Sequence, residues 1–189
     1  MNRAQTFSKN QLLPLFFLFF LSVSAFADQN DVRLAELFRS LKSTESESRA
    51  LVFENKIWHI WMEHYDPDVE SAMFQGVEAM KVQQFEQAFG HFSLLIKLAP
   101  DYAEGWNKRA TVLYLMGRFK ESEEDVMRTL ELEPRHFGAL SGQGLIRIAL
   151  QDWNGAIYFL ESALKINPHM HGVIMNLKYA RQKQKESMT

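Results

Sequence analysis

The fold is decided by residues 103–136, which read AEGWNKRATVLYLMGRFKESEEDVMRTLELEPRH. This stretch ends two residues after Pro134, and prolines also stand 34 residues before it, at Pro100, and 34 residues after it, at Pro168. Aligning the chain on these prolines divides it without an insertion into three segments of 34 residues, 69–102, 103–136 and 137–170. A fixed period of this length is the signature of a repeat architecture, in which each unit buries its apolar face against its neighbours.

The three segments share a pattern of small, bulky and helix-ending residues. Small residues occupy position 8 (Gly76, Ala110, Gly144) and position 20 (Ala88, Ser122, Ala156). Bulky residues occupy position 17 (Phe85, Phe119, Trp153), position 24 (Phe92, Val126, Leu160), position 28 (Ile96, Leu130, Leu164) and position 30 (Leu98, Leu132, Ile166). Small residues let two helices approach closely, and the proline at position 32 cannot continue a helix. Each segment therefore predicts two antiparallel helices with a stop after the second.

This pattern resembles the tetratricopeptide repeat family, and the likeness covers 102 of the 189 residues. The resemblance implies an all-α fold in which three helix-turn-helix repeats stack into a right-handed solenoid. Residues 104–114 and 134–142 are also similar to segments of small exported bacterial tetratricopeptide proteins of unassigned function.

The regions that flank the repeats are predicted to be helical but do not match the repeat pattern. Apolar periodicity predicts one helix over 31–42 and a second that stops at Asp66-Pro67. We expect residues 28–68 to form an N-terminal helical cap and residues 171–189 to form a C-terminal capping helix and tail. The large residues predicted for one face of the second helix are Leu51, Trp58, Trp61 and Tyr65.

Residues 1–27 contain the three parts of a secretory signal peptide. Arg3 and Lys9 form a basic start, an apolar run extends from Leu12 to Val23, and Ala25-Phe-Ala27 is a cleavage site. The apolar run is shorter than the roughly 20 residues that a membrane-spanning helix needs. We expect cleavage after Ala27, a bacterial periplasmic location and no stable membrane insertion of the mature chain. The alternative is that the segment is kept as an anchor.

Composition and motifs argue against catalysis, nucleic-acid binding and cofactors. The net charge is −2, without the basic excess of a nucleic-acid-binding protein. The chain has no cysteine, which excludes disulfides, thiolate zinc sites and a cysteine nucleophile. It has no glycine-rich phosphate loop and no H-E-x-x-H motif. The pairs His59/His64 and His169/His171 lack the spacing or the nearby carboxylate of a metal site, so we expect no enzyme, no cofactor and no metal.

The resemblance implies a concave groove that is lined by the first helix of each repeat and holds a segment of a partner protein. Family members that grip the C-terminal carboxylate of chaperones have Lys, Arg and Asn at five positions where this chain has Met73, Val77, Lys108, Gly138 and Gly142. That ligand class is therefore not expected. The implied groove residues are Glu70, Met73, Val77, Glu104, Asn107, Thr111, Tyr114, Ser141 and Leu145.

Lys108 and Arg135 extend this set, because they belong to a dense polar group with Glu104, Asn107 and His136 beside one junction between repeats. A planar guanidinium suits a carboxylate, so Arg135 is a candidate to bind an acidic group of the partner. The alternative is a solvated junction in which Glu104 pairs with a neighbouring base.

Together these features predict a non-catalytic interaction module or scaffold of the bacterial cell envelope, whose partner is a protein or peptide of the envelope. Two alternatives stay open. One is a self-associating structural protein, whose groove is filled by a second copy or by its own helix that carries Trp58 and Trp61. The other is an accessory binder of a small ligand or metal, or a weak envelope hydrolase.

Overall fold

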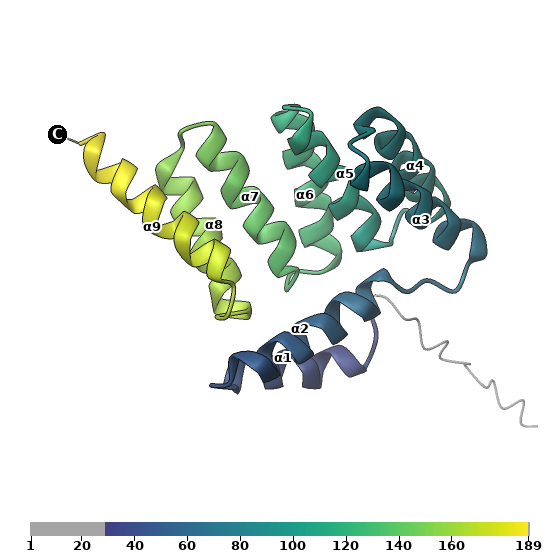
Figure 1. Cartoon of the computed structure of the whole chain (residues 1–189), viewed down its shortest axis with the longest axis horizontal. Helices are drawn as coiled ribbons and strands as arrows, with labels where there is room; N and C mark the ends of the chain where they lie inside the picture. Colours follow the sequence, from purple (N-terminus) through teal and green to yellow (C-terminus); the bar gives the residue numbers. More distant parts are fainter. Residues whose placement is uncertain (1–28, 189) are drawn as a thin grey trace, which may run out of the picture.

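A computed structural model describes residues 29–188, which form nine α-helices and no strand. The repeat helices form consecutive antiparallel pairs that stand side by side (Figure 1), and this confirms the predicted all-α solenoid of three repeats. The helices are α1 (Arg33–Ser43), α2 (Glu47–Met62), α3 (Pro67–Lys81), α4 (Phe85–Leu98), α5 (Ala103–Leu115), α6 (Phe119–Leu132), α7 (Phe137–Ala149), α8 (Trp153–Ile166) and α9 (His171–Glu186).

The turn inside each repeat contains one residue in the left-handed backbone region. Gln83, Gly117 and Gln151 each follow the first helix of a repeat by two residues, with φ angles of 58°, 73° and 58°. A residue with a Cβ pays about 1–2 kcal/mol for this conformation, whereas glycine adopts it freely. Only the middle repeat therefore carries the residue that the turn favours.

Close approach of the two helices explains the small residue at position 8. Gly144 of α7 faces Leu160 of α8, which is fully buried. A Cβ on Gly144 would lie 2.5 Å from Leu160 Cδ2 and 2.6 Å from its Cγ, closer than real carbon atoms approach. Gly76 faces the ring of Phe92 in the same way. The bulky residue at position 24 thus fills the space that the small residue at position 8 leaves.

Replacing Gly144 with alanine is expected to lower the free energy of unfolding by about 1–3 kcal/mol, because the new methyl group overpacks the α7–α8 contact. Gly90 on α4 is the matched control, since a Cβ there meets no atom within 4 Å. Gly90→Ala should raise the same free energy by up to about 1 kcal/mol through helix propensity. Urea unfolding followed by far-UV circular dichroism measures both, and stabilisation by Gly144→Ala would contradict the close approach.

The N-terminal helical pair, α1 and α2, packs against the second and third repeats instead of covering the outer face of the first. In Figure 1 the pair lies below the repeats, across the ends of their helices. Its core contains Phe38 and Trp61 and takes in Phe137 from the start of α7. This position differs from the predicted cap, because the apolar side chains of the pair find their partners at the junction between repeats.

Helix α2 contacts three successive junctions of the solenoid. The hydroxyl of Tyr102, before α5, donates to the carbonyl oxygen of Trp61 at 2.7 Å. The indole of Trp61 stacks on the ring of His136, before α7, with centroids 4.1 Å apart. Asn167, before α9, donates from Nδ2 to Glu54 Oε2 at 3.0 Å. The helix therefore fixes the spacing between the repeats along one edge.

Two of the four residues predicted for the buried face of α2 are indeed packed. Trp58 and Trp61 pack against the repeats, whereas Leu51 and Tyr65 are exposed. Tyr65 lies outside the helix, because α2 ends at Met62, before the predicted stop.

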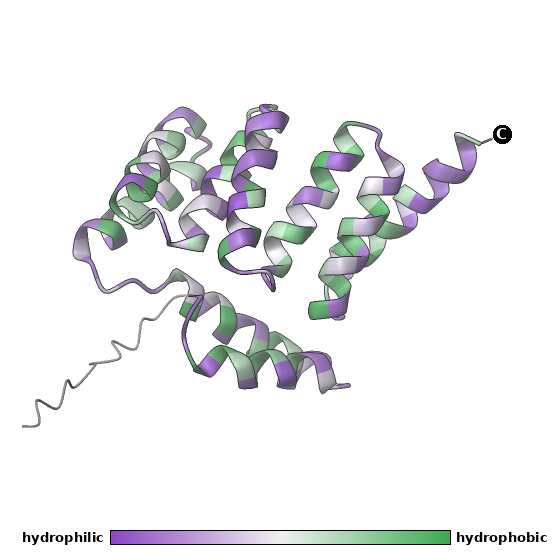
Figure 2. Ribbon diagram, turned by 180° about the vertical axis from the view of Figure 1, so that it is seen from behind, coloured by the Kyte–Doolittle hydropathy of each residue, from purple (hydrophilic) through white to green (hydrophobic). Residues whose placement is uncertain are grey.

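Helix α9 covers the other end of the solenoid. Val173, Leu177 and Ala180 are buried against the third repeat. The last turns of the helix are hydrophilic (Figure 2), as the exposed end of a stack of repeats requires.

The predicted signal peptide lies outside the described residues. Within residues 29–188, none of the helices combines the length and the apolar character needed to cross a membrane.

Candidate partner-binding groove

A cavity of about 190 Å³ lies between α5 and α7, and we call it the inner groove. Five of the predicted groove residues line it: Asn107, Thr111, Tyr114, Ser141 and Leu145. The other lining residues are Ala110, Ser122, Val126, Gly138 and Gly142. The resemblance to the repeat family implied these lining residues of α5 and α7, and their spacing of three and four places them on one face of each helix.

The two glycines of α7 lie in different surroundings. A Cβ on Gly138 would lie 2.6 Å from Cη2 of Trp58, so the indole of Trp58 packs against this glycine. A Cβ on Gly142 would meet no atom within 4 Å, so the groove is open there. The repeat pattern did not predict Trp58 at this place, because the residue lies outside the repeats.

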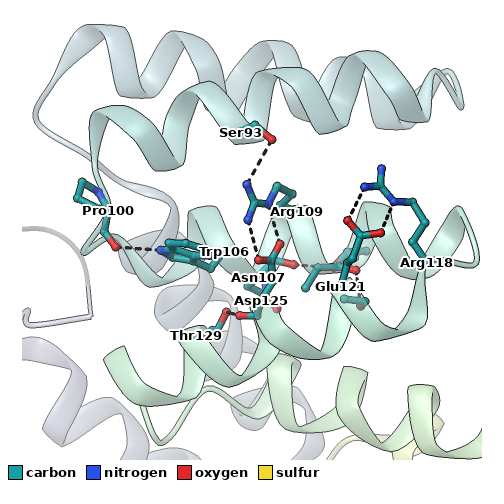
Figure 3. Close-up of polar contacts among 12 residues, drawn as sticks. Ser93, Pro100, Trp106, Asn107, Arg109, Arg118, Glu121, Asp125 and Thr129 are labelled. Carbon is teal, nitrogen blue, oxygen red and sulfur yellow. Dashed lines mark hydrogen bonds and ion pairs between the residues drawn. The ribbon is translucent and has the colours of Figure 1, made fainter.

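A buried ion pair holds the helices behind the inner groove (Figure 3). Arg109 of α5 donates from Nε and Nη2 to the two carboxylate oxygens of Asp125 on α6, both at 2.7 Å. Its Nη1 donates to Ser93 Oγ on α4 at 3.3 Å. Burial raises the pKa of Asp125, and the hydrogen bonds and charge of Arg109 offset part of that rise. This bidentate pair joins α4, α5 and α6.

A second buried polar cluster, the Glu104 cluster, lies where α5, α7 and α2 meet. Glu104 is 1% exposed, and its carboxylate accepts hydrogen bonds from Asn107 Nδ2 at 3.0 Å and His136 Nε2 at 2.9 Å. Lys108 Nζ lies 3.0 Å from the other carboxylate oxygen. His136 Nδ1 accepts from the backbone N–H of Ala139 at 3.0 Å and caps α7. With Nδ1 accepting, Nε2 is the ring nitrogen that donates to Glu104.

The charge of Glu104 is stabilised by its neighbours. Burial by itself raises the pKa of the carboxyl group, but the ammonium of Lys108 and the hydrogen bond from His136 outweigh it and hold the pKa below the ordinary value of 4.5. Glu104 is therefore an ionised structural residue at neutral pH.

These contacts change the role expected of three predicted site residues. Glu104 is buried and Lys108 is its ion-pair partner, so neither lines the inner groove. The side chain of Arg135 binds the carboxylate of Glu133 at 2.8 and 2.7 Å and lies over the ring of Phe38. The guanidinium predicted to bind a ligand carboxylate already has a carboxylate within the chain. Of the two alternatives for this polar group, binding an acidic group of a partner or pairing within the chain, the structure favours pairing within the chain.

The three predicted residues of the first repeat do not reach the inner groove. Glu70 is exposed on α3, Met73 is buried in the core of the first repeat, and Val77 packs at the edge of that core. Met73 is unavailable to a partner because its side chain faces Phe92 and its neighbours.

Larger cavities lie outside the inner groove. One of about 490 Å³ lies between α1 and α2, one of about 390 Å³ lies between the α2–α3 linker and the α4–α5 loop, and one of about 290 Å³ lies between α2 and the start of α9. None of these three is lined by a residue predicted for the groove. In the described part of the chain, no group of three or more histidine, aspartate or glutamate side chains is placed to hold a metal ion.

Known proteins resemble the chain in sequence and in fold. A TPR repeat-containing protein of Rhizobium etli is 36% identical over 114 residues, which are 60% of this chain and 56% of that protein. The TPR2B domain of yeast Sti1 superimposes with a TM-score of 0.60 at 22% identity, covering 62% of this chain and 99% of that domain. The Sgt2 TPR domain of Aspergillus fumigatus gives a TM-score of 0.62 at 20% identity, covering 65% of this chain and 82% of that chain.

The chain is similar in sequence to tetratricopeptide repeat proteins and has their fold. No model of a protein family matches it. A second relative, Hsp70-Hsp90 organizing protein 1 of Glycine max, is 25% identical over 108 residues. The chain spans 56% of the Rhizobium tetratricopeptide protein and 19% of the Glycine protein. The likeness thus covers only part of each of these relatives.

Proposed function

We propose that this tetratricopeptide protein is a non-catalytic interaction module that binds a segment of another protein in the inner groove. The observation that carries the proposal is an open cavity between the first helices of two adjacent repeats, lined by Asn107, Thr111, Tyr114, Ser141 and Leu145. Its lining combines apolar side chains with hydrogen-bonding groups.

Two further findings support a protein segment as the occupant. The first tetratricopeptide domain of RPAP3, which superimposes with a TM-score of 0.61 at 19% identity, was solved bound to the HSP90 peptide SRMEEVD. The yeast Sti1 domain was solved as a complex with a peptide of Hsp70. The inner groove, at about 190 Å³, is also smaller than the roughly 300–1,000 Å³ that a drug-sized ligand occupies. A small-molecule function is therefore less well supported than a protein partner.

The proposed location is the bacterial periplasm, and the proposed partner is a protein of the cell envelope. This part rests on residues 1–27, whose basic start, apolar run and A-x-A site have the order of a signal peptide.

In-cell photo-crosslinking tests the proposed function. A photoreactive residue at Thr111, exposed in the inner groove, is expected to give a discrete adduct with one protein, identified by mass spectrometry. The same probe at Glu124, exposed on α6, is the control position. Thr111 suits the probe better than Asn107, whose side chain is buried and bonded to Glu104.

A matched pair of variants tests whether the adduct depends on binding in the inner groove. Gly142→Trp places a large side chain in the open part of the inner groove, and Gly90→Trp places the same side chain on the outside of α4. The Thr111 adduct should disappear with Gly142→Trp and persist with Gly90→Trp. An adduct that survives Gly142→Trp, or no adduct from Thr111, would refute binding in the groove.

A further inference from the structure

The inner groove lacks any free positive charge. Among the described residues that line it, none has a charged side chain. The nearby cations are held in ion pairs: Lys108 with Glu104, Arg109 with Asp125, and Arg147 with Glu123 and Asp152. An acidic side chain that entered the groove would lose its water without gaining a counter-charge, and this costs several kcal/mol for an unpaired ion.

The size of the inner groove limits what enters it. Its apolar lining includes Ala110, Val126 and Leu145, and burial there stabilises a partner by about 0.8 kcal/mol for each methylene group. The volume of about 190 Å³ matches one side chain better than a run of several.

The polar lining residues supply both acceptors and donors, all of them uncharged. Asn107 uses its Nδ2 on Glu104, which leaves its side-chain oxygen as an acceptor. Thr111 donates its hydroxyl hydrogen to the carbonyl of Asn107 at 2.9 Å, so its oxygen also has acceptor capacity. These acceptors suit backbone N–H groups of a partner segment, the hydroxyls of Tyr114 and Ser141 suit its carbonyl groups, and none of these groups supplies a counter-charge for a carboxylate.

From the charge, volume and lining chemistry of the inner groove we infer that it selects a partner segment by one uncharged apolar side chain, aliphatic or aromatic, and excludes acidic side chains. This inference rests on the proposed function and makes it more specific, because it states the chemistry of the residue that anchors the partner.

Short blocked peptides of the form acetyl-Gly-Ser-Gly-X-Gly-Ser-Gly-amide test the inference with the full chain. The measurement is the change of backbone amide chemical shifts in ¹⁵N-labelled protein, titrated to millimolar peptide. With X as Leu, Met or Phe, the amides of Thr111 and Ser141 should shift. With X as Asp or Glu, the apparent affinity should be weaker by about tenfold or more. Gly142→Trp should abolish the shifts, and Gly90→Trp should keep them.

Each other outcome overturns the inference. Asp or Glu peptides that shift Thr111 and Ser141 as strongly as the Leu peptide would remove the charge preference, while groove binding itself would stand. Shifts that persist in Gly142→Trp would place the peptides elsewhere, and no shift with any X would remove the apolar anchor. Failure of the proposed function is read separately, from the absence of a groove-specific adduct at Thr111.

Discussion

Replacing Trp61 with alanine will lower the free energy of unfolding by about 3–5 kcal/mol, the cost of deleting a buried aromatic side chain. The indole is 1% exposed, stacks on His136 at 4.1 Å and contacts the rings of Phe38 and Phe137. It joins the N-terminal pair to the junction between the second and third repeats. Because three different elements line the space that Trp61 fills, the cavity cannot collapse by moving one of them.

Urea unfolding of the full chain, followed by circular dichroism, measures this loss. Hydrogen exchange adds a local readout: amides of α2 should exchange faster in Trp61→Ala, whereas amides of α4 in the first repeat should keep their protection. Phe74→Ala is the control, since Phe74 is 66% exposed on α3, and we expect a change within about 0.5 kcal/mol. A loss below about 1 kcal/mol for Trp61→Ala would mean that α1 and α2 contribute little to the stability of the repeats.

Replacing Glu104 with glutamine will lower the free energy of unfolding by about 3 kcal/mol at pH 7. The substitution keeps the size of the side chain but removes the charge that pairs with Lys108. It also replaces one carboxylate oxygen, an acceptor, by an NH2 group, a donor, among side chains that donate to Glu104. Removing one partner of a buried pair costs about 3–5 kcal/mol, and the partial exposure of Lys108 places the expected loss at the lower end.

The pH dependence gives this prediction a second readout. The pKa of Glu104 is lower in the folded chain than its ordinary value of 4.5, so the folded state binds its proton less readily than the unfolded state does. The stabilisation is therefore complete above about pH 4.5 and is lost as the pH falls through the lower folded pKa. The stability difference between the wild type and Glu104→Gln should shrink below pH 4.5.

Unfolding at a series of pH values from 3 to 7 measures the difference. Glu124→Gln, an exposed substitution on α6, is the matched control and should change the free energy by less than about 0.5 kcal/mol at pH 7. If the loss in Glu104→Gln is the same at pH 3.5 as at pH 7, the Glu104 carboxylate is not the source of the stabilisation.

The repeat pattern predicted the helical pairs correctly because the residues that define it act on neighbouring parts of the chain. Prolines at 100, 134 and 168 each stand two residues after the end of a helix, which cannot continue through them, and the small residues at position 8 contact the very next helix of the chain. The resemblance to the repeat family implied Asn107, Thr111 and Tyr114 as groove residues, and in the structure they line the inner groove. The binding role of that groove is still a prediction.

The sequence by itself therefore determined the fold class and the order of the helices, and its resemblance to the repeat family implied the groove residues of α5 and α7. Only the tertiary structure decided that Glu104 and Arg135 hold partners within the chain, that Trp58 packs against Gly138, and that the N-terminal pair lies along the junctions. The reason is physical. Repeat periodicity reflects contacts between neighbouring helices. The N-terminal helices lie outside the repeats, and their position is set by where their aromatic side chains bury the most apolar surface.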